Sequence, residues 1–244
     1  MGLGLHNVAF NSATHAITNG LVGWWKFDEG NGTITADSSG FKHTGSFLNS
    51  PTWVSGKTGN GLSFTGTNSS NAAGVVTQPL TISSSAVTLM GWININWNAS
   101  LGGSFPLILE AGESATTGLA LTIATGTFQD WINGDILCFG NGYTGTTNFA
   151  PRAVAAQPTL TAFTWHHVAG VLSPNLSQIY VDGVPLTMRV ALTGSVGNIT
   201  TAINFASYPS GTGDWSNNSK LDDIRIYNRA LSPNEIKQIA NILG

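Results

Sequence analysis

The chain has 244 residues and a formal net charge of −3, which is enough for one large β-type domain or two small domains. Charged residues make up only 9 % of the chain and hydrophobic residues 41 %, which excludes disorder of the highly charged kind. The few Lys and Arg residues form no basic stripe, so no nucleic-acid partner is expected.

The N-terminal 20 residues are expected to form an extension or arm, and residues 21–244 a single domain. Residues 1–20 lack the positive start and continuous apolar run of a secretion signal. No stretch approaches the roughly 18 apolar residues of a membrane span, so membrane insertion is not expected. The only cysteine, Cys138, is predicted to be a buried small hydrophobe and excludes an internal disulfide.

Short apolar runs separated by polar clusters about every 8–12 residues predict many short strands, as in a sandwich or barrel. The predicted strands are 21–27, 61–65, 87–97, 105–110, 118–124, 136–140, 165–172, 178–181 and 221–227.

Two local signals define further elements. Asp182-Gly183 predicts a tight hairpin turn, because both residues tolerate positive φ. Near the C-terminus, Ser232 fits a helix N-cap, Pro233 the first helical position and Glu235 the third position of a capping box. A short C-terminal helix is therefore expected.

Several segments, taken in order, resemble the laminin G-like, concanavalin A-like lectin/glucanase family. They are Leu21 to Gly30 running into Asp37-Ser38-Ser39-Gly40, then 87–93, 165–171, 179–185 and Leu221-Asp222-Asp223-Ile224-Arg225-Ile226-Tyr227 running on to Ser232. The resemblance implies an all-β, two-sheet antiparallel jelly-roll sandwich. It also implies, in many members, a structural calcium ion and a glycan- or surface-binding role.

Calcium ligands are expected where the first and last strands of such a sandwich meet. Regular alternation in the last strand places Asp222 on an apolar face with Ile224 and Ile226. A carboxylate there is costly to bury unless it is paired or binds a cation. With the resemblance, this favours Asp37 and Asp222 as ligands, with carbonyls of the 37–43 loop and charge from Glu29 or Asp28.

The two main candidate ligands, Asp37 and Asp222, also have simpler interpretations. Asp37 fits an Asx turn, and Asp222 could pair with Lys220 or Arg229. On the other face of the same strand, Asp223 and Arg225 are expected to form an exposed pair of little energetic value.

Aromatic side chains in the expected loops suggest a glycan surface, because sugar C–H faces stack on aromatic rings and nearby polar groups bind hydroxyls. The candidate residues are Trp97, Trp131, Tyr143 and Trp215, with Asp130 and Asp214 beside two of them. The alternative is that these rings pack against their own loops. Trp24, Trp25, Trp92 and Trp165 lie in expected strands and are assigned to packing.

No catalytic residues are predicted. Glycoside hydrolysis needs two carboxylates flanking one bond, and the spacing of Glu110 and Glu113 indicates a strand end and a turn. His166 and His167 are adjacent in a strand, so they point to opposite faces, one packed and the other exposed.

The sequence therefore favours a non-catalytic glycan-binding or adhesion module with a structural calcium ion, displayed on a virion or outside the cell. Its expected partner is a glycan or surface polysaccharide. One alternative is a structural virion decoration or tail component that contacts neighbouring subunits through residues 1–20. A polysaccharide-degrading enzyme is the weaker alternative.

Overall fold

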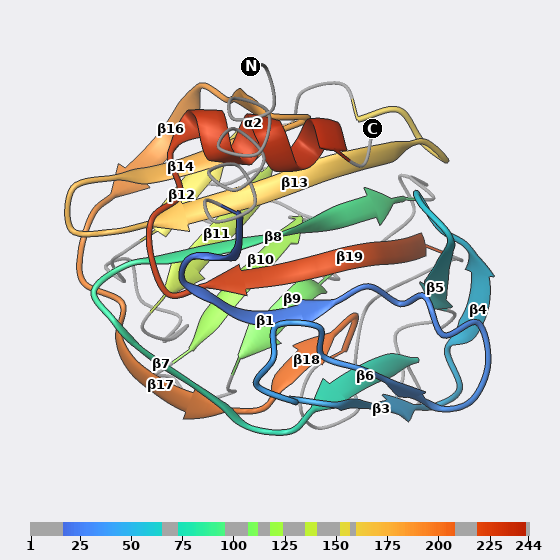
Figure 1. Ribbon diagram of the computed structural model, residues 1–244. Coiled ribbons are helices and arrows are strands. Elements are labelled where there is room, and N and C mark those ends of the chain that lie inside the picture. Colours follow the sequence, from blue (N-terminus) through green and yellow to red (C-terminus); the bar gives the residue numbers. More distant parts are fainter. Residues whose placement is uncertain are drawn as a thin grey trace, which may run out of the picture.

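The computed structural model describes residues 17–64, 73–95, 107–111, 118–123, 135–140, 152–156, 160–207 and 219–242. Within these ranges the chain forms two large antiparallel sheets, called sheet A and sheet B here, with a short helix outside sheet A (Figure 1). This confirms the expected two-sheet sandwich with a C-terminal helix. No helix of the described part is long and apolar enough to cross a membrane.

Sheet A contains the first and last strands. Its members are β1 (Leu21–Trp25), β4 (Thr52–Ser55), β5 (Asn60–Phe64), β8 (Val87–Asn94), β13 (Trp165–Leu172), β14 (Ser177–Val181), β15 (Val184–Pro185) and β19 (Ser219–Tyr227). They lie in the order β15-β14-β13-β8-β19-β5-β4, and β1 also pairs with β19. The expected pairing of first and last strands is therefore present.

Sheet B supplies the opposite layer. Its members are β2 (Ile34–Thr35), β3 (Gly45–Leu48), β6 (Gly74–Thr77), β9 (Leu107–Ala111), β10 (Leu119–Ile123), β11 (Ile136–Gly140), β12 (Arg152–Ala155), β16 (Met188–Leu192) and β18 (Ile203–Phe205). They lie in the order β16-β12-β11-β10-β9-β18-β6-β3-β2. A separate two-stranded sheet joins β7 (Leu80–Ser84) to β17 (Gly197–Thr201).

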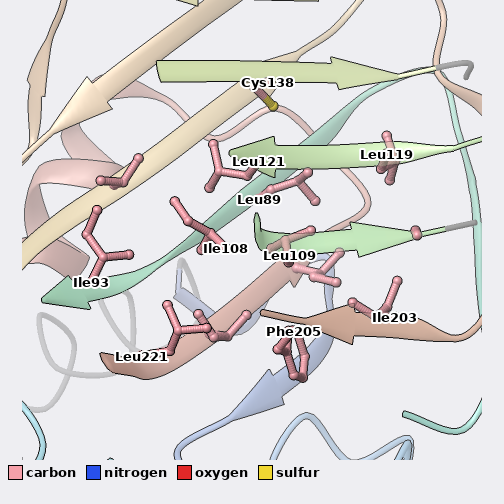
Figure 2. Packing of buried hydrophobic residues seen from close by; sticks show 14 of the residues in the cluster. Leu89, Ile93, Ile108, Leu109, Leu119, Leu121, Cys138, Ile203, Phe205 and Leu221 are labelled. Carbon is pink, nitrogen blue, oxygen red and sulfur yellow. The ribbon is translucent and has the colours of Figure 1, made fainter. Parts of the chain in front are cut away.

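The core fills the space between the two sheets. Alternate residues point inward, so Leu89 and Ile93 of β8 pack toward Leu109 of β9 and Leu121 of β10 (Figure 2). The sheets approach closely at Gly170, where an added Cβ would collide with Cys138. Cys138 is fully buried, as expected, and burial raises the pKa of its thiol.

A second apolar layer explains why β8 is buried on both faces. Met90 points to the outer face of sheet A, where it packs with Tyr227 and with Ile236 and Ile239 of helix α2 (Pro233–Ile242). The single-face alternation assumed for 87–97 is interrupted because this helix makes the outer face apolar too. The strand ends at Asn94, and Trp97 lies outside the described residues.

Both local signals in the C-terminal half are confirmed. Asp182 and Gly183 have φ of 49° and 75° in the β14–β15 turn. The Ser232 hydroxyl accepts a bond from the Glu235 N–H, and Glu235 accepts one from the Ser232 N–H. Hydrogen bonds from Arg229 are the main cause that lowers the pKa of Glu235 to about 2.

The aromatic centre of the core provides a stability test. Phe205 is fully buried, with its ring centroid 4.9 Å from that of Trp25 and 5.8 Å from that of Phe27. We expect Phe205→Ala to lower the free energy of unfolding in urea by about 3–5 kcal/mol, because it leaves a cavity. The control Phe41→Ala removes a ring that is 62 % exposed and should change stability by less than about 0.5 kcal/mol. Equal losses would contradict this account of the core.

Candidate functional site

The last strand, β19, contains an irregularity that changes which side chains share a face. Its register with β8 shifts between Asp222 and Arg225, and Asp223 has a φ of +50°. This extra residue forms a β-bulge, which reverses the alternation on one side of it. Asp222 therefore faces outward with Arg225, and Ile224 faces the core. The expected grouping of Asp222 with Ile224 and Ile226 is wrong because regular alternation does not allow for a bulge.

The pair Asp223–Arg225 is also not the exposed pair that the sequence suggests. Both side chains are buried, with Arg225 Nη2 3.0 Å from Asp223 Oδ2. Trp24 on β1 donates its indole N–H to Asp223, and the Arg225 guanidinium lies 4.4 Å from the centroid of the Trp24 ring. The indole thus covers the ion pair and supplies one of its hydrogen bonds.

Asp222 supports a tight turn and leaves one oxygen unsatisfied. Its Oδ2 accepts hydrogen bonds from the N–H groups of Lys57 (2.8 Å) and Thr58 (3.1 Å) in the β4–β5 turn. Oδ1 is buried and has no hydrogen-bond partner in the described part of the chain. Burial, with smaller contributions from Asp223 and Asp28, raises the pKa of Asp222 to about 7. Arg229, one of the partners considered for Asp222, pairs with Glu235 instead.

Asp37 acts as the support of its own loop. Its Oδ1 accepts bonds from the N–H groups of Trp24 (3.0 Å) and Ser39 (2.8 Å), and Oδ2 accepts one from His43 N–H (3.0 Å). Partial burial opposes ionisation, but the bonds from Ser39, His43 and Trp24 outweigh it and lower the pKa of Asp37. The bond to Ser39 is the Asx turn that the sequence allowed.

Glu29 has a similar local role, so the three expected calcium ligands have separate partners. Its Oε1 accepts bonds from Ala36 N–H (2.7 Å) and the Thr35 hydroxyl (3.3 Å). Across the described ranges, no three His, Cys, Asp or Glu side chains are grouped so as to hold a metal ion. The donor that fits a cation on chemical grounds is the unsatisfied Oδ1 of Asp222.

Asp222 belongs to a polar row across the outer face of sheet A. It lies directly opposite Trp92 on β8, which lies opposite His167 on β13. Trp92 Nε1 and His167 Nδ1 are also buried without a hydrogen-bond partner among the described residues. Burial is the main cause that lowers the pKa of His167 to about 3, so this histidine is neutral. His167 is the packed member of the histidine pair and His166 is partly exposed, as expected.

The outer face of sheet B carries a second polar row that the sequence did not reveal. Glu110 on β9 lies between Ala120 on β10 and Asn204 on β18. Asn204 is buried, and within the described ranges its Oδ1 has no hydrogen-bond partner. Arg152, farther along on β12, is also buried. Alternation of polar and apolar residues within these strands could have predicted the polar row. However, β12 and β18 are too short for such a pattern to be recognised in the sequence.

Strand connectivity brings several predicted glycan-binding segments to one end of the sandwich, called the loop end here. In sheet B the start of β9 lies beside the end of β10, which lies beside the start of β11, and β18 runs antiparallel to β9. In sheet A, Asn94 near the end of β8 lies opposite Lys220 near the start of β19. The segments 96–106, 124–134 and 208–218 therefore all attach to this end.

Five of the six predicted glycan residues belong to those three segments, and all six lie outside the described residues. The five residues in these segments are Trp97, Asp130, Trp131, Asp214 and Trp215. Tyr143 belongs to the segment 141–151, which joins β11 to β12 at the opposite end of sheet B.

Comparison with known proteins identifies the family. A family model described as the concanavalin A-like lectin/glucanases superfamily matches residues 65–237, so the chain belongs to this superfamily. No curated protein sequence matches the chain.

Two solved structures illustrate the likeness in fold. One is domain 4 of AbnA, an extracellular GH43 arabinanase of Geobacillus stearothermophilus, in complex with arabinotriose; identity is 14 %, the TM-score is 0.63, and 90 % of this chain and 98 % of that chain are covered. The other is botulinum neurotoxin type C, whose cell entry depends on interaction with two ganglioside molecules; identity is 14 %, the TM-score is 0.65, and 95 % of this chain and 53 % of that chain are covered. The chain thus spans about half of the toxin chain.

The raised pKa of Asp222 predicts a pH effect. A raised pKa means that the native state favours the protonated acid, so its stability falls as pH rises through about 7. We expect Asp222→Asn, which keeps an acceptor for the turn, to gain about 2–3 kcal/mol over wild type between about pH 5 and pH 8 in chelator. Urea unfolding at several pH values measures the stability difference between the variant and wild type. Both proteins contain His167, so its contribution to the pH dependence cancels from this difference.

Asp37→Asn is the matched control. Since the pKa of Asp37 is lowered, this residue is ionised across the whole pH range of the experiment. The stability difference between this variant and wild type should therefore stay constant. A constant difference for Asp222→Asn as well would contradict the burial of an ionisable carboxyl at position 222.

Proposed function

We propose that the chain is a non-catalytic glycan-binding module whose ligand binds at the loop end. The observation that carries the proposal is that the strand ends joined by the segments 96–106, 124–134 and 208–218 lie together at that end. They hold three tryptophans and two aspartates, the combination of stacking surface and polar groups that suits a sugar. Neighbours in fold whose structures involve arabinotriose or gangliosides support the same proposal.

The surroundings of Glu110 favour binding over hydrolysis. Glycoside hydrolysis uses two carboxylates about 5–9.5 Å apart. Across sheet B, the residues directly opposite Glu110 are Ala120 and Asn204. Their side chains offer a methyl group and an amide, and neither is a carboxylate. An amide beside a carboxylate is suited to holding hydroxyl groups.

The proposal places the module outside the cell or on a virion surface, where a glycan or surface polysaccharide is the partner. An extracellular arabinanase domain and a neurotoxin whose cell entry depends on gangliosides, both neighbours in fold, support a site of action outside the cell. In the extension 1–20, the carbonyl of Ile17 accepts the Tyr227 hydroxyl and that of Asn19 accepts Arg229 Nε. A virion-subunit contact through this extension would therefore start from an anchor on β19 and the residues that follow it.

We also propose a structural calcium ion, with Asp222 as its principal ligand. The unsatisfied Oδ1 of Asp222 and the neighbouring charge of Asp28 support this choice. Asp37 and Glu29, the other expected ligands, contribute less because their oxygens already accept backbone N–H groups. The ion would neutralise a buried carboxylate and connect β19 to the β4–β5 turn.

Chelation tests this calcium proposal. An ion that binds only the native state raises its stability, so a chelator should lower the melting temperature of wild type by several degrees, at about 2–4 °C per kcal/mol. Asp222→Ala should remove this sensitivity, and the control Asp37→Ala should retain it. A wild-type melting temperature that does not change with chelator would contradict the metal proposal. Loss of the chelator effect in Asp37→Ala but not in Asp222→Ala would instead indicate a site in the 37–43 loop.

Glycan binding has its own test. We expect wild type to bind at least one member of a glycan array that includes arabinotriose and sialylated ganglioside oligosaccharides, followed by titration calorimetry of each hit. Trp131→Ala or Trp215→Ala should weaken that binding by about tenfold, because aromatic stacking contributes up to about 1.5 kcal/mol. The control Tyr143→Ala, from the opposite end, should leave it unchanged. Absence of binding across the array would contradict the proposed function.

A further inference from the structure

At the loop end, an aromatic side chain that the sequence analysis did not single out stands exposed in a constrained turn. Phe163 is 68 % exposed, more than any other large hydrophobic residue of the described ranges. Its φ is +60°, a conformation that bulky residues rarely adopt. The ring gains little from burial and its backbone is strained, so packing does not account for a phenylalanine here.

The backbone of Phe163 is fixed to the end of β8. Its N–H donates to the Ile95 carbonyl at 2.9 Å, and its carbonyl accepts Asn94 Nδ2 at 3.1 Å. The turn is closed by Thr164 N–H, which donates to the Thr161 carbonyl at 3.3 Å. These bonds hold the ring at the point where β8 ends, so the ring is presented by a rigid element and not by a loose loop.

His166 fixes the other side of the turn. Its Nε2 accepts the Thr161 N–H at 3.1 Å, which places the proton on Nδ1, where it faces Asp182 Oδ2 at 2.8 Å. Asp182 Oδ1 in turn accepts the His167 N–H at 2.8 Å. The turn is therefore linked through one histidine to the β14–β15 hairpin.

Beside the turn the side chains pack too closely to leave room for a buried ligand, so a ligand here would bind on the outer surface of the turn. Ile93, Ile95 and Leu160 pack against Thr161, Thr164 and His166 at this point. The Asp182 side chain, which pairs with His166, is 47 % exposed. An exposed apolar ring, with threonine hydroxyls in the same turn and an exposed carboxylate linked to that turn, matches the two-sided chemistry of a sugar ring.

We propose that Phe163 is a stacking platform for a sugar ring of the bound glycan, with the Thr161–His166–Asp182 group beside it. This inference rests on the proposed glycan-binding function and assigns the site a residue outside the predicted set. A sugar is favoured over a lipid surface or a second protein chain because Phe163 is a single exposed large hydrophobic residue in the segment 160–166, not part of an apolar patch. Those occupants need a contiguous apolar patch of several hundred Å².

Three substitutions isolate the ring from its backbone. Phe163→Gly removes the ring and relieves the positive φ, so loss of binding cannot be attributed to new strain. Phe163→Tyr keeps a stacking ring. Phe41→Ala is the matched control, because Phe41 is comparably exposed at 62 % but belongs to the 37–43 loop attached to β1.

The experiment measures affinity for the glycan-array hits of wild type by titration calorimetry, with melting temperatures confirming that each variant is folded. We expect Phe163→Gly to weaken binding about five- to tenfold, with Phe163→Tyr and Phe41→Ala within about twofold of wild type. If wild type binds a glycan and Phe163→Gly binds it equally well, the inference fails while the proposed function stands. If wild type binds none, both fail.

Light scattering and vesicle sedimentation provide the test of the other occupants. Wild type should remain monomeric and should not sediment with neutral phosphatidylcholine vesicles. Self-association or vesicle binding that Phe163→Gly abolishes would overturn the sugar assignment in favour of that occupant.

Discussion

Pairing between the first strand and the last strand organises the part of the molecule around Asp222. β19 pairs with β8, β5 and β1, so three segments distant in sequence meet along one strand. The bulge at Asp223 then determines what each of them encounters. It turns Asp222 toward the β4–β5 turn, Asp223 toward the Trp24 indole and Ile224 toward the core. A regular β19 would place one of these carboxylates among apolar side chains, at a large cost in desolvation.

Most of the acidic side chains in the described ranges hold the backbone in place. Carboxylates that accept backbone N–H groups occur in the first turns of the domain, in the β14–β15 hairpin and at the helix start: Asp28, Glu29, Asp37, Asp182, Asp222 and Glu235. Bonds of this charge-assisted kind are stronger than neutral ones. A surface composed of Gly, Ser, Thr and Asn can therefore keep defined loops without many ion pairs. Asp222 differs from the rest because one of its oxygens is buried without a partner.

Local signals in the sequence predicted the elements that local interactions determine. The helix cap at Ser232 and the Asp182-Gly183 turn are of this kind, and so are the strands β8 and β13, which are long and mostly apolar. Strands such as β12 and β18 escaped notice because they have four and three residues, and their pairing is decided by neighbours far along the chain. The face of Asp222 could not be predicted, since a single residue with positive φ reverses the alternation from which it was inferred. For Asp37 the sequence already contained the correct alternative, the Asx turn, because that bond depends on residues two positions apart.

Long-range strand pairing also explains why a binding site at the loop end is physically reasonable. The strands that end there are held by pairing across both sheets, so the segments that follow them start from fixed points even though their own sequences are rich in Gly, Asn and Thr. The backbone of Phe163 is fixed at this end, because it bonds to the end of β8 and its turn is linked to the β14–β15 hairpin through His166. Because the backbone of Phe163 is already fixed, little backbone entropy is lost when a ligand stacks on its ring. Variation in the attached segments could then alter which sugar is bound, while Phe163 stays the same.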